Sequence, residues 1–496
     1  MIMKFQIDRF FLFGLLVLSV SCGDFLDRQP LDQITIDNFF TSANDADKAL
    51  IACYIPLESD NWTGKGWQIT EIPTDNAQPG GTDPGFTPID NFTVAADNEA
   101  VAAYWSAHYQ MVTLTNAVIE AVEVMTLEES KKALFLAEAR FLRAFAYFDL
   151  VRIYGPVPLI TNPPKYGENL LFPRSSVADV YAQIISDLEF AAELLPIQWS
   201  GTNVGRASRG AAWALLAKVY LTNRQFVPAR NAARNCMDLG RYDLMDRFAD
   251  NFELSTSDNN RESIFQVQYV GCGPFGTGNQ QQAFYAPWGE GITKNRDGWG
   301  SQIPTGPTTN NPNTTVYDIY ENTDLRRDPT IMTPNTFYPS INPDDGGYTY
   351  PNSGASASGI NIKKYVVGAG PNICFMSTPQ NSHIIRYSDV LLTYAEAIME
   401  IEGGVSTNSE ALEAFNRVRT RAGLEALTMI DREIMLHERR LEFAFEGHRW
   451  FDLIRSGRII EIMTLHGKQI NTHNVLFPIP AAEIEINPEL DQNPGY

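Results

Sequence analysis

Apolar residues recur at three- and four-residue steps over long stretches of the chain, and this spacing predicts a mainly α-helical protein. The longest such stretch runs from residue 104 to 154, with one apolar stripe formed by Leu134, Ala137, Phe141, Ala144, Phe145, Phe148 and Val151. Two prolines in the segment GPVP, 155–158, end this stretch because proline cannot continue a helix. Further helical patterns cover 177–195, 209–222, 384–402 and 431–455.

One helical stretch resembles a tetratricopeptide unit. The residues Trp213-x2-Leu216-Ala217-x2-Tyr220 are followed by Ala229, which matches the spacing of that repeat. Large and small residues alternate in this way where two antiparallel helices pack closely. Weaker echoes lie upstream and downstream, and three or more stacked units bury a continuous core. We therefore expect a scaffold of tetratricopeptide-like helix pairs.

Glycine and proline are concentrated between residues 271 and 382, where 112 residues contain 15 Gly and 12 Pro. This composition disfavours helices, so we expect a loop-dominated insert with short strands. The predicted organisation is a helical region with an early binding loop, then the insert, then C-terminal helices with an extended tail. The corresponding ranges are 48–262, 263–382 and 383–496, and we expect 22–496 to form one compact unit.

The N-terminus has the pattern of a secretory signal. Two basic residues precede an apolar run at 10–18, which is far shorter than the roughly 20 residues needed to span a bilayer. Small residues then lead to Cys22, as in a bacterial lipoprotein signal. We predict a signal peptide at 1–21, lipidation of Cys22 and an acidic tether at 22–47. The alternative is an ordinary signal peptide with an incidental cysteine.

The composition excludes two broad classes of protein. The chain has 38 Lys and Arg against 59 Asp and Glu, a formal net charge of −21. Binding to nucleic acid needs clustered basic residues that neutralise phosphates, and the sequence has no such cluster. A content of 44% hydrophobic and 11% aromatic residues excludes an intrinsically disordered chain. We expect a globular protein with no nucleic-acid partner.

The sequence offers no convincing catalytic, metal or cofactor motif. The four cysteines after Cys22 have no CxxC spacing for zinc, and only Cys272 with Cys374 deserves a disulfide test. The segment 271–276 fits GxGxxG, but no helical pattern follows it, so a dinucleotide site is not expected. There is no GxSxG nucleophile motif. We predict a protein that is not an enzyme and needs no metal or cofactor.

The charged run at 437–455 is the remaining candidate for acid–base or metal chemistry. HExxH is absent because Leu441 takes the place of the second histidine. Opposite charges alternate at helical spacing, for example Arg439 and Glu442. We interpret this run as a structural ion-pair network on one packed helix. A pair of glycosidase carboxylates is not recognisable from sequence, because their separation is a three-dimensional property.

Aromatic residues also stand in polar, Gly-rich segments away from the helical stripes, namely NWTGKGW, FYAPWGEG and RDGWGS. Flat aromatic rings can pack against the C–H faces of sugars, while Asp, Asn and Arg side chains bond the hydroxyls. The alternative is that these tryptophans fix the loops to the helical core. The predicted ligand-binding set is Trp62, Trp67, Asp75, Asn76, Tyr285, Trp288, Arg296 and Trp299.

Six segments together resemble the SusD/RagB family of Bacteroidetes outer-membrane lipoproteins. They are SCGDFLDRQP, EARFLRAFAYFDLVRIYGPVPL, GRASRGAAWALLAKVYL, RYSDVLLTYAEA, HERRLEFAFEGHRWFDLIRSGR and LFPIPAAEIEINPELDQNPGY. The resemblance runs in order from Cys22 to Tyr496. It implies a SusD-like fold, a lipid anchor in the outer membrane and exposure at the cell surface.

The resemblance also implies a function. Members of this family capture oligosaccharides and pass them to a SusC-like TonB-dependent transporter. Their sugars lie on an aromatic arc supplied by early loops and by the central insert, the regions that contain 62–76 and 285–299 in this chain. Peptide capture by the same scaffold is the alternative, and a glycosidase that uses two carboxylates is a third hypothesis.

Overall fold

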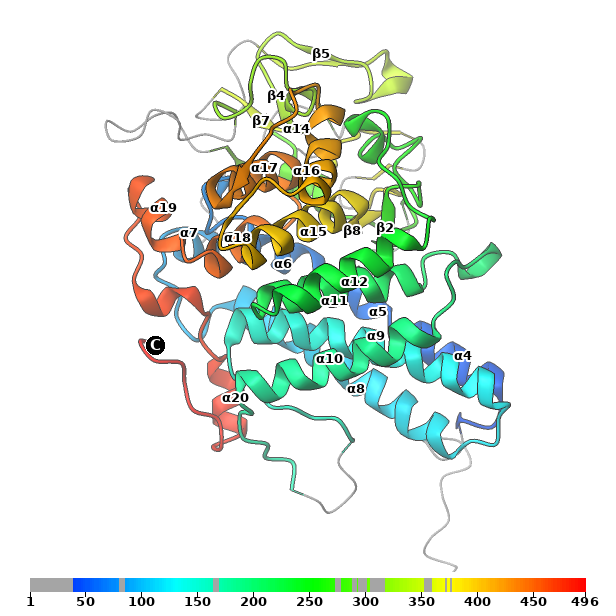
Figure 1. The fold of residues 1–496 in the computed structure, drawn as a ribbon. Coiled ribbons are helices and arrows are strands. Elements are labelled where there is room, and N and C mark those ends of the chain that lie inside the picture. Colours follow the sequence, from blue (N-terminus) through cyan, green and yellow to red (C-terminus); the bar gives the residue numbers. More distant parts are fainter. Residues whose placement is uncertain are drawn as a thin grey trace, which may run out of the picture.

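The computed structural model describes residues 39–79, 85–163, 169–272, 278–287, 292, 301–303, 317–351, 359–370, 373–374 and 377–496. Long helices are stacked side by side through most of the molecule, and the strands β4, β5 and β7 gather at one end of the stack (Figure 1). The mainly helical fold class is therefore confirmed.

Seven helices form the scaffold, and each packs against the next in the series. They are α8 (Glu99–Val124), α9 (Glu129–Tyr154), α10 (Val177–Leu194), α11 (Arg209–Thr222), α12 (Phe226–Asp238), α15 (Tyr387–Ile401) and α16 (Ser409–Arg421). Consecutive helices joined by short connections pack as antiparallel neighbours, which is how tetratricopeptide-like pairs stack. The expected scaffold of helix pairs is present.

Local capping explains where several of these helices begin and end. The side chains of Asn98, Ser176, Ser208 and Asn408 each accept hydrogen bonds from backbone N–H groups of the first turn that follows. Helix α9 ends at Gly155, whose φ of 74° is readily adopted by glycine. The stretch predicted as helical from 104 to 154 is thus two helices, divided at 125–128.

Within the described residues, four short helices precede the scaffold. They are α4 (Ala43–Ala52), α5 (Ile55–Glu58), α6 (Thr63–Thr70) and α7 (Phe86–Asp90). The first three pack against α8, and α7 packs against α6. Helix α6 corrects the sequence interpretation of NWTGKGW as a loop, because Trp67 lies inside a helix.

The insert contains short strands, as expected, and also short helices, which its Gly- and Pro-rich composition did not predict. Four two-residue strands form one antiparallel sheet in the order β1 (Gln78–Pro79), β3 (Ser301–Gln302), β7 (Asn361–Ile362) and β4 (Ile331–Met332). Pairs of strands are formed by β2 (Ser263–Val267) with β8 (Ser382–Arg386), β5 (Phe337–Tyr338) with β6 (Tyr348–Thr349), and β9 (Val405–Ser406) with β10 (Ile430–Asp431). Short helices are α13 (Gln281–Tyr285) and α14 (Arg327–Thr330).

The prediction of one helix over 431–455 is wrong, because the structure has two helices in this range. The structure has α17 (Arg432–Phe443) and α18 (Arg449–Arg455), separated by a turn. In that turn Phe445 and Gly447 have φ angles of 67° and 75°, a left-handed backbone that a helix does not contain. The break lets the two helices present their charged side chains in different directions.

The tail is not wholly extended, which corrects a second expectation. After α19 (Ile459–Leu465), helix α20 (Ala481–Ile486) forms within the last twenty residues. Pro480 lies at its N-cap, where its lack of an N–H group removes no hydrogen bond within the helix. The tail returns to α9, because the Phe477 N–H donates to the Ile153 carbonyl over 2.8 Å.

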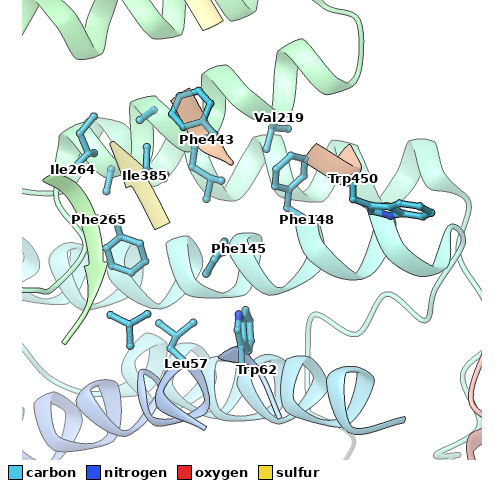
Figure 2. Close-up of a cluster of buried hydrophobic side chains, with 14 of the residues drawn as sticks. Leu57, Trp62, Phe145, Phe148, Val219, Ile264, Phe265, Ile385, Phe443 and Trp450 are labelled. Atoms are coloured by element: carbon cyan, nitrogen blue, oxygen red, sulfur yellow. The ribbon is translucent and has the colours of Figure 1, made fainter. Parts of the chain in front are cut away.

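One hydrophobic core joins the early helices, the insert and the C-terminal helices. Figure 2 shows Trp62, Phe145 and Phe148 together with Phe265 of β2 and Trp450 of α18 in this cluster. A shared core of this kind makes the described regions depend on one another for burial of their apolar surface.

Cys272 and Cys374, the pair that the sequence suggested for a disulfide test, form a disulfide. Their Cα atoms are 5.1 Å apart. This bond closes a stretch of the insert across 102 residues. Cys236 is a buried free thiol, and burial raises its pKa above the ordinary value. A thiol in such surroundings is poorly reactive, because burial disfavours the thiolate.

Candidate functional site

The two segments that contain the predicted binding residues meet in the fold. Strand β1 follows Asn76 closely, and it pairs with β3 so that Pro79 lies opposite Ser301. The ring of Trp67 on α6 stacks on Phe284 of α13 with a centroid distance of 5.4 Å. The early segment and the central insert therefore form one continuous region.

Three of the predicted aromatic residues lie inside this region and not on its surface. Trp62, Trp67 and Tyr285 are exposed by only 5%, 6% and 1%. The rings of Trp62 and His108 stack with a centroid distance of 3.5 Å. The Tyr285 hydroxyl donates to the Phe445 carbonyl over 2.8 Å. Their burial favours the alternative interpretation, in which these rings fix the segments to the core. Their ligand-binding role stays a prediction that this packing does not favour.

The glycines of NWTGKGW explain why the sequence suggested a loop. A Cβ atom at Gly64 would lie 3.0 Å from the Phe284 ring, and one at Gly66 would lie 3.0 Å from the Tyr104 ring. These glycines allow aromatic rings to approach helix α6 closely, so they serve packing and not chain flexibility. From sequence alone, a Gly-rich segment near tryptophan can be either a flexible loop or a closely packed helix. Only the fold distinguishes the two.

Asp75 and Asn76 are also buried, at 2% and 0% exposure. Asp75 accepts two hydrogen bonds from Arg449, at 2.8 and 2.7 Å, and lies 3.0 Å from Arg440. Asn76 Oδ1 accepts from Arg440 Nε over 3.0 Å. Burial alone would raise the pKa of Asp75, but Arg440 and Arg449 hold it well below its ordinary value. In the structure these two side chains bond protein partners and not an incoming hydroxyl.

The ion-pair network expected in the charged run is present, but the sequence pairing was wrong. Arg439 contacts Asp452 and Asp389, each at 2.9 Å, and not Glu442 three residues away. Glu442 instead accepts from Arg386 at 2.8 Å and from other arginines. The break between α17 and α18 turns these side chains toward partners that are distant in sequence. The charged run therefore holds the fold together across elements.

Glu71 is a buried acid that the sequence analysis missed. Its Oε1 accepts from the Gly447 N–H over 2.6 Å, and its Oε2 accepts from Asn76 Nδ2 over 3.4 Å. Burial raises the pKa of Glu71 to about 8, against the opposing effect of these two hydrogen bonds. This carboxyl links helix α6 to the turn between α17 and α18, and only the fold brings them together.

A small cavity of about 130 Å³ lies where these elements meet, lined by Trp62, Trp67, Tyr285 and the polar residues Asp149 and Lys218. A water molecule needs roughly 10–15 Å³ of such space. The cavity thus has room for a group of waters and is too small for an oligosaccharide. Most of its lining residues are buried, so we do not assign the binding site to it.

Three of the predicted binding residues, Trp288, Arg296 and Trp299, lie outside the described residues, as does Cys22. Trp199 is a half-exposed tryptophan that the sequence analysis did not select. It stands in the segment QWSGTN, so the rule that selected NWTGKGW would have found it. Among the described residues, no group of three or more His, Cys, Asp or Glu is placed to hold a metal ion. In the same part of the chain, no helix has the length and apolar character of a membrane span.

Comparison with known proteins agrees with this architecture of stacked helix pairs and a loop-rich insert. A family model described as "SusD family" matches residues 255–496, and one described as "Starch-binding associating with outer membrane" matches 24–221. A SusD-like protein of Bacteroides ovatus is 34% identical over 463 residues, which cover 88% of this chain and 80% of that protein. SusD-like protein P2 of Formosa agariphila is 29% identical, covering 97% and 98%. The chain therefore belongs to the SusD family.

Two similar solved structures carry ligand names. One, described as a crystal structure with xylogluco-oligosaccharide, has a TM-score of 0.76 and 28% identity, covering 89% of this chain and 97% of that one. The other, a laminarin-binding SusD-like protein, has a TM-score of 0.75 and 26% identity, covering 91% and 99%. The likeness extends over nearly the whole of each chain.

The buried pairing of Asp75 yields the first testable prediction. Asp75→Asn removes the charge that compensates Arg440 and Arg449, and we expect a loss of about 3–5 kcal/mol in the free energy of unfolding. Urea denaturation measures this loss. The control is Asp246→Asn, because Asp246 pairs with Arg261 at 2.6 Å but its side chain is 90% exposed. It should cost less than about 1 kcal/mol, and equal losses in both variants would contradict the assignment.

The raised pKa of Glu71 predicts a pH dependence of stability. The folded state keeps the Glu71 proton up to a pKa of about 8, while the unfolded state releases it near 4.5. The stabilising contribution of Glu71 to the free energy of unfolding is therefore complete below about pH 4.5 and is lost as pH rises through the folded-state pKa of about 8. Between these two values the free energy of unfolding falls by up to about 1.4 kcal/mol per pH unit. Urea titrations between pH 5 and 9 should show a shallower decline in Glu71→Gln. Identical slopes in both proteins would rule out this role.

Proposed function

We propose that this protein captures neutral oligosaccharides. The observation that carries this proposal is the likeness, over nearly the whole chain, to one solved protein with a xylogluco-oligosaccharide and to another described as laminarin-binding. A starch-binding relative, SusD of Bacteroides thetaiotaomicron, is 23% identical over 439 residues. These names belong to the relatives, and for this chain they support a ligand class and not a particular sugar.

We place the sugar-stacking role on Trp288 and Trp299, with Arg296 as a partner for sugar hydroxyls. Trp299 is two residues from β3, the strand that pairs with β1. This pairing supports the proposal, because it brings Ser301, which follows these residues in sequence, opposite Pro79 of the early segment.

We propose binding without catalysis. Hydrolysis by two carboxylates needs one ionised group and one protonated group facing the sugar. The described acids of this region are engaged elsewhere, since Asp75 bonds Arg449 and Glu71 is buried against Gly447. Loops on a rigid scaffold are suited to ligand capture, because the scaffold holds their ends while their sequence varies.

We further propose that Cys22 carries lipid, that the protein is exposed at the surface of the outer membrane, and that it delivers sugar to a SusC-like TonB-dependent transporter. The matching model described as associating with outer membrane supports this location. A Cys22→Ser variant should leave the membrane fraction, because stable attachment depends on the acyl chains. A variant that still sediments with the outer membrane would contradict the anchor.

Calorimetric titration tests the binding proposal. We expect the purified protein to bind at least one oligosaccharide from a panel of xyloglucan, laminarin and starch fragments, and not to bind a peptide mixture. The double variant Trp288→Ala/Trp299→Ala should lose affinity at least about tenfold, because stacking on aromatic rings contributes on the order of 1 kcal/mol each.

Trp62→Phe is the matched control for this titration. It keeps a ring at a buried position, so affinity should change less than about twofold if that ring serves the core. Binding to none of the sugars would contradict the proposed function. Unchanged affinity in the double variant would instead contradict only the proposed site.

A further inference from the structure

A second aromatic surface lies on the connection between α10 and α11, apart from the site proposed above. Trp199 on this connection is half-exposed and lines two neighbouring hollows of about 250 and 310 Å³. Arg206 also lines both, so the hollows share a wall. The larger one is bordered by α4 and α9, and the smaller one by β2. No residue of β1 or β3 lines either hollow.

The Trp199 ring is held in place by buried groups. Its Nε1–H donates to the Ala207 carbonyl over 2.8 Å, and the Arg206 guanidinium lies 4.8 Å from the ring centroid. Arg206 in turn donates two hydrogen bonds to Glu138, at 2.7 and 2.8 Å, and one to Asp47 at 2.8 Å. Glu138 is fully buried. A ring fixed in this way loses little entropy when a ligand stacks on it.

Tyr242 supplies a second ring in the smaller hollow. Its hydroxyl lies 3.0 Å from Ser208 Oγ. A Cβ atom at Gly210 would lie 2.4 Å from the tyrosine ring and hydroxyl, so this glycine makes room for the ring on helix α11. Two fixed aromatic rings thus line one hollow, and the buried side chain of Phe265 lines it as well.

The polar groups of the smaller hollow suit hydroxyl groups. Gln198 and Arg241 line it, and within the described residues neither side chain has a hydrogen-bonding partner. The charge of Arg206 is already balanced by Glu138 and Asp47. The surroundings therefore offer amide and guanidinium donors beside aromatic rings, with Arg241 as the one lining charge that no carboxylate pairs among the described residues. This chemistry fits an uncharged, polyhydroxylated ligand.

We propose that these hollows form a second carbohydrate-binding groove, in which Trp199 and Tyr242 stack sugar rings while Gln198 and Arg241 bond hydroxyls. This inference rests on the proposed function, because it assigns the same class of ligand to a new place. One volume lies just below and the other at the lower limit of the roughly 300–1,000 Å³ of small-molecule sites, so each hollow suits a short piece of glycan. The groove gives the protein a second point of contact with a long glycan or with a second chain.

The test separates this groove from the loop site. Ligand-observed NMR at millimolar sugar measures the affinity of the wild-type protein and of Trp288→Ala/Trp299→Ala for the oligosaccharide that binds most tightly. In the double-variant background we expect weak residual binding. Adding Trp199→Ala should reduce it about fivefold, which corresponds to the loss of one stacked ring.

Two further variants guard against a simple folding defect. Gln198→Ala/Arg241→Ala changes only side chains without hydrogen-bonding partners and should weaken residual binding several-fold with an unchanged melting temperature. Gln225→Ala is the matched control, because Gln225 is an exposed glutamine in the α11–α12 turn whose side chain has no cap hydrogen bond. It should leave binding unchanged.

The outcomes distinguish the two proposals. Absence of residual binding in the double variant, or residual binding that neither groove variant changes, would overturn the groove while the proposed function stands. Binding that depends on Trp199 but not on Trp288 and Trp299 would support the groove and contradict the loop site. A wild-type protein that binds no sugar would contradict the proposed function and the groove with it.

Discussion

The structure depends on a buried cluster of ion pairs centred on Arg386 at the end of β8. Its guanidinium donates to Glu262 at 2.6 Å, to Glu442 at 2.8 Å and to Glu446 at 2.8 Å. All four side chains are almost completely removed from water. Charges in such a place are tolerated only when each one is paired and hydrogen-bonded, so the elements that carry them must meet in one arrangement. The cluster thereby joins β2, β8 and α17 across the boundary between insert and C-terminal helices.

This constraint explains what the rest of the chain is free to do. The acids of the charged run and Asp75 are committed to arginines, and the aromatic rings beneath them are committed to the core. Ligand binding is then left to segments whose ends are held by the scaffold and whose side chains are not already engaged in the core. The α10–α11 connection meets this description, since Trp199 is anchored to Ala207 while Gln198 and Arg241 beside it have no hydrogen-bonding partner among the described residues. A rigid interior with adaptable loops is a sound basis for capturing extended, uncharged ligands.

Local patterns made much of the scaffold predictable. Helix α11 begins and ends where the apolar period predicted, because Ser208 caps it and the pattern stops at Thr222. The break between α17 and α18 was not predictable, since Phe445 adopts a left-handed conformation that its residue type does not suggest. Helix α20 was missed because prolines near the C-terminus suggested an extended chain, although Pro480 lies at the start of the helix.

The site was harder to predict than the fold, for a physical reason. Asp75 and Arg449 are separated by 374 residues, so no spacing along the chain could indicate that they pair. Gly64 and Phe284 are likewise far apart in sequence, so their close approach could not be predicted. This contact is part of the packing of α6, a segment that the sequence suggested to be a loop. The predicted domain boundaries stay predictions, as do the binding roles of Trp288, Arg296 and Trp299. The sequence identified the kind of residue a sugar site needs, but it could not separate free rings from buried ones.

Hydrogen–deuterium exchange with and without a bound oligosaccharide tests the central claim most directly, because it reports which backbone segments a ligand protects. We expect protection in the segment 285–303, a smaller effect at 195–208, and no change in α11, α12 or α17. Protection confined to the scaffold helices, with none at 285–303, would contradict the conclusion that sugar is captured by the loops on a rigid scaffold.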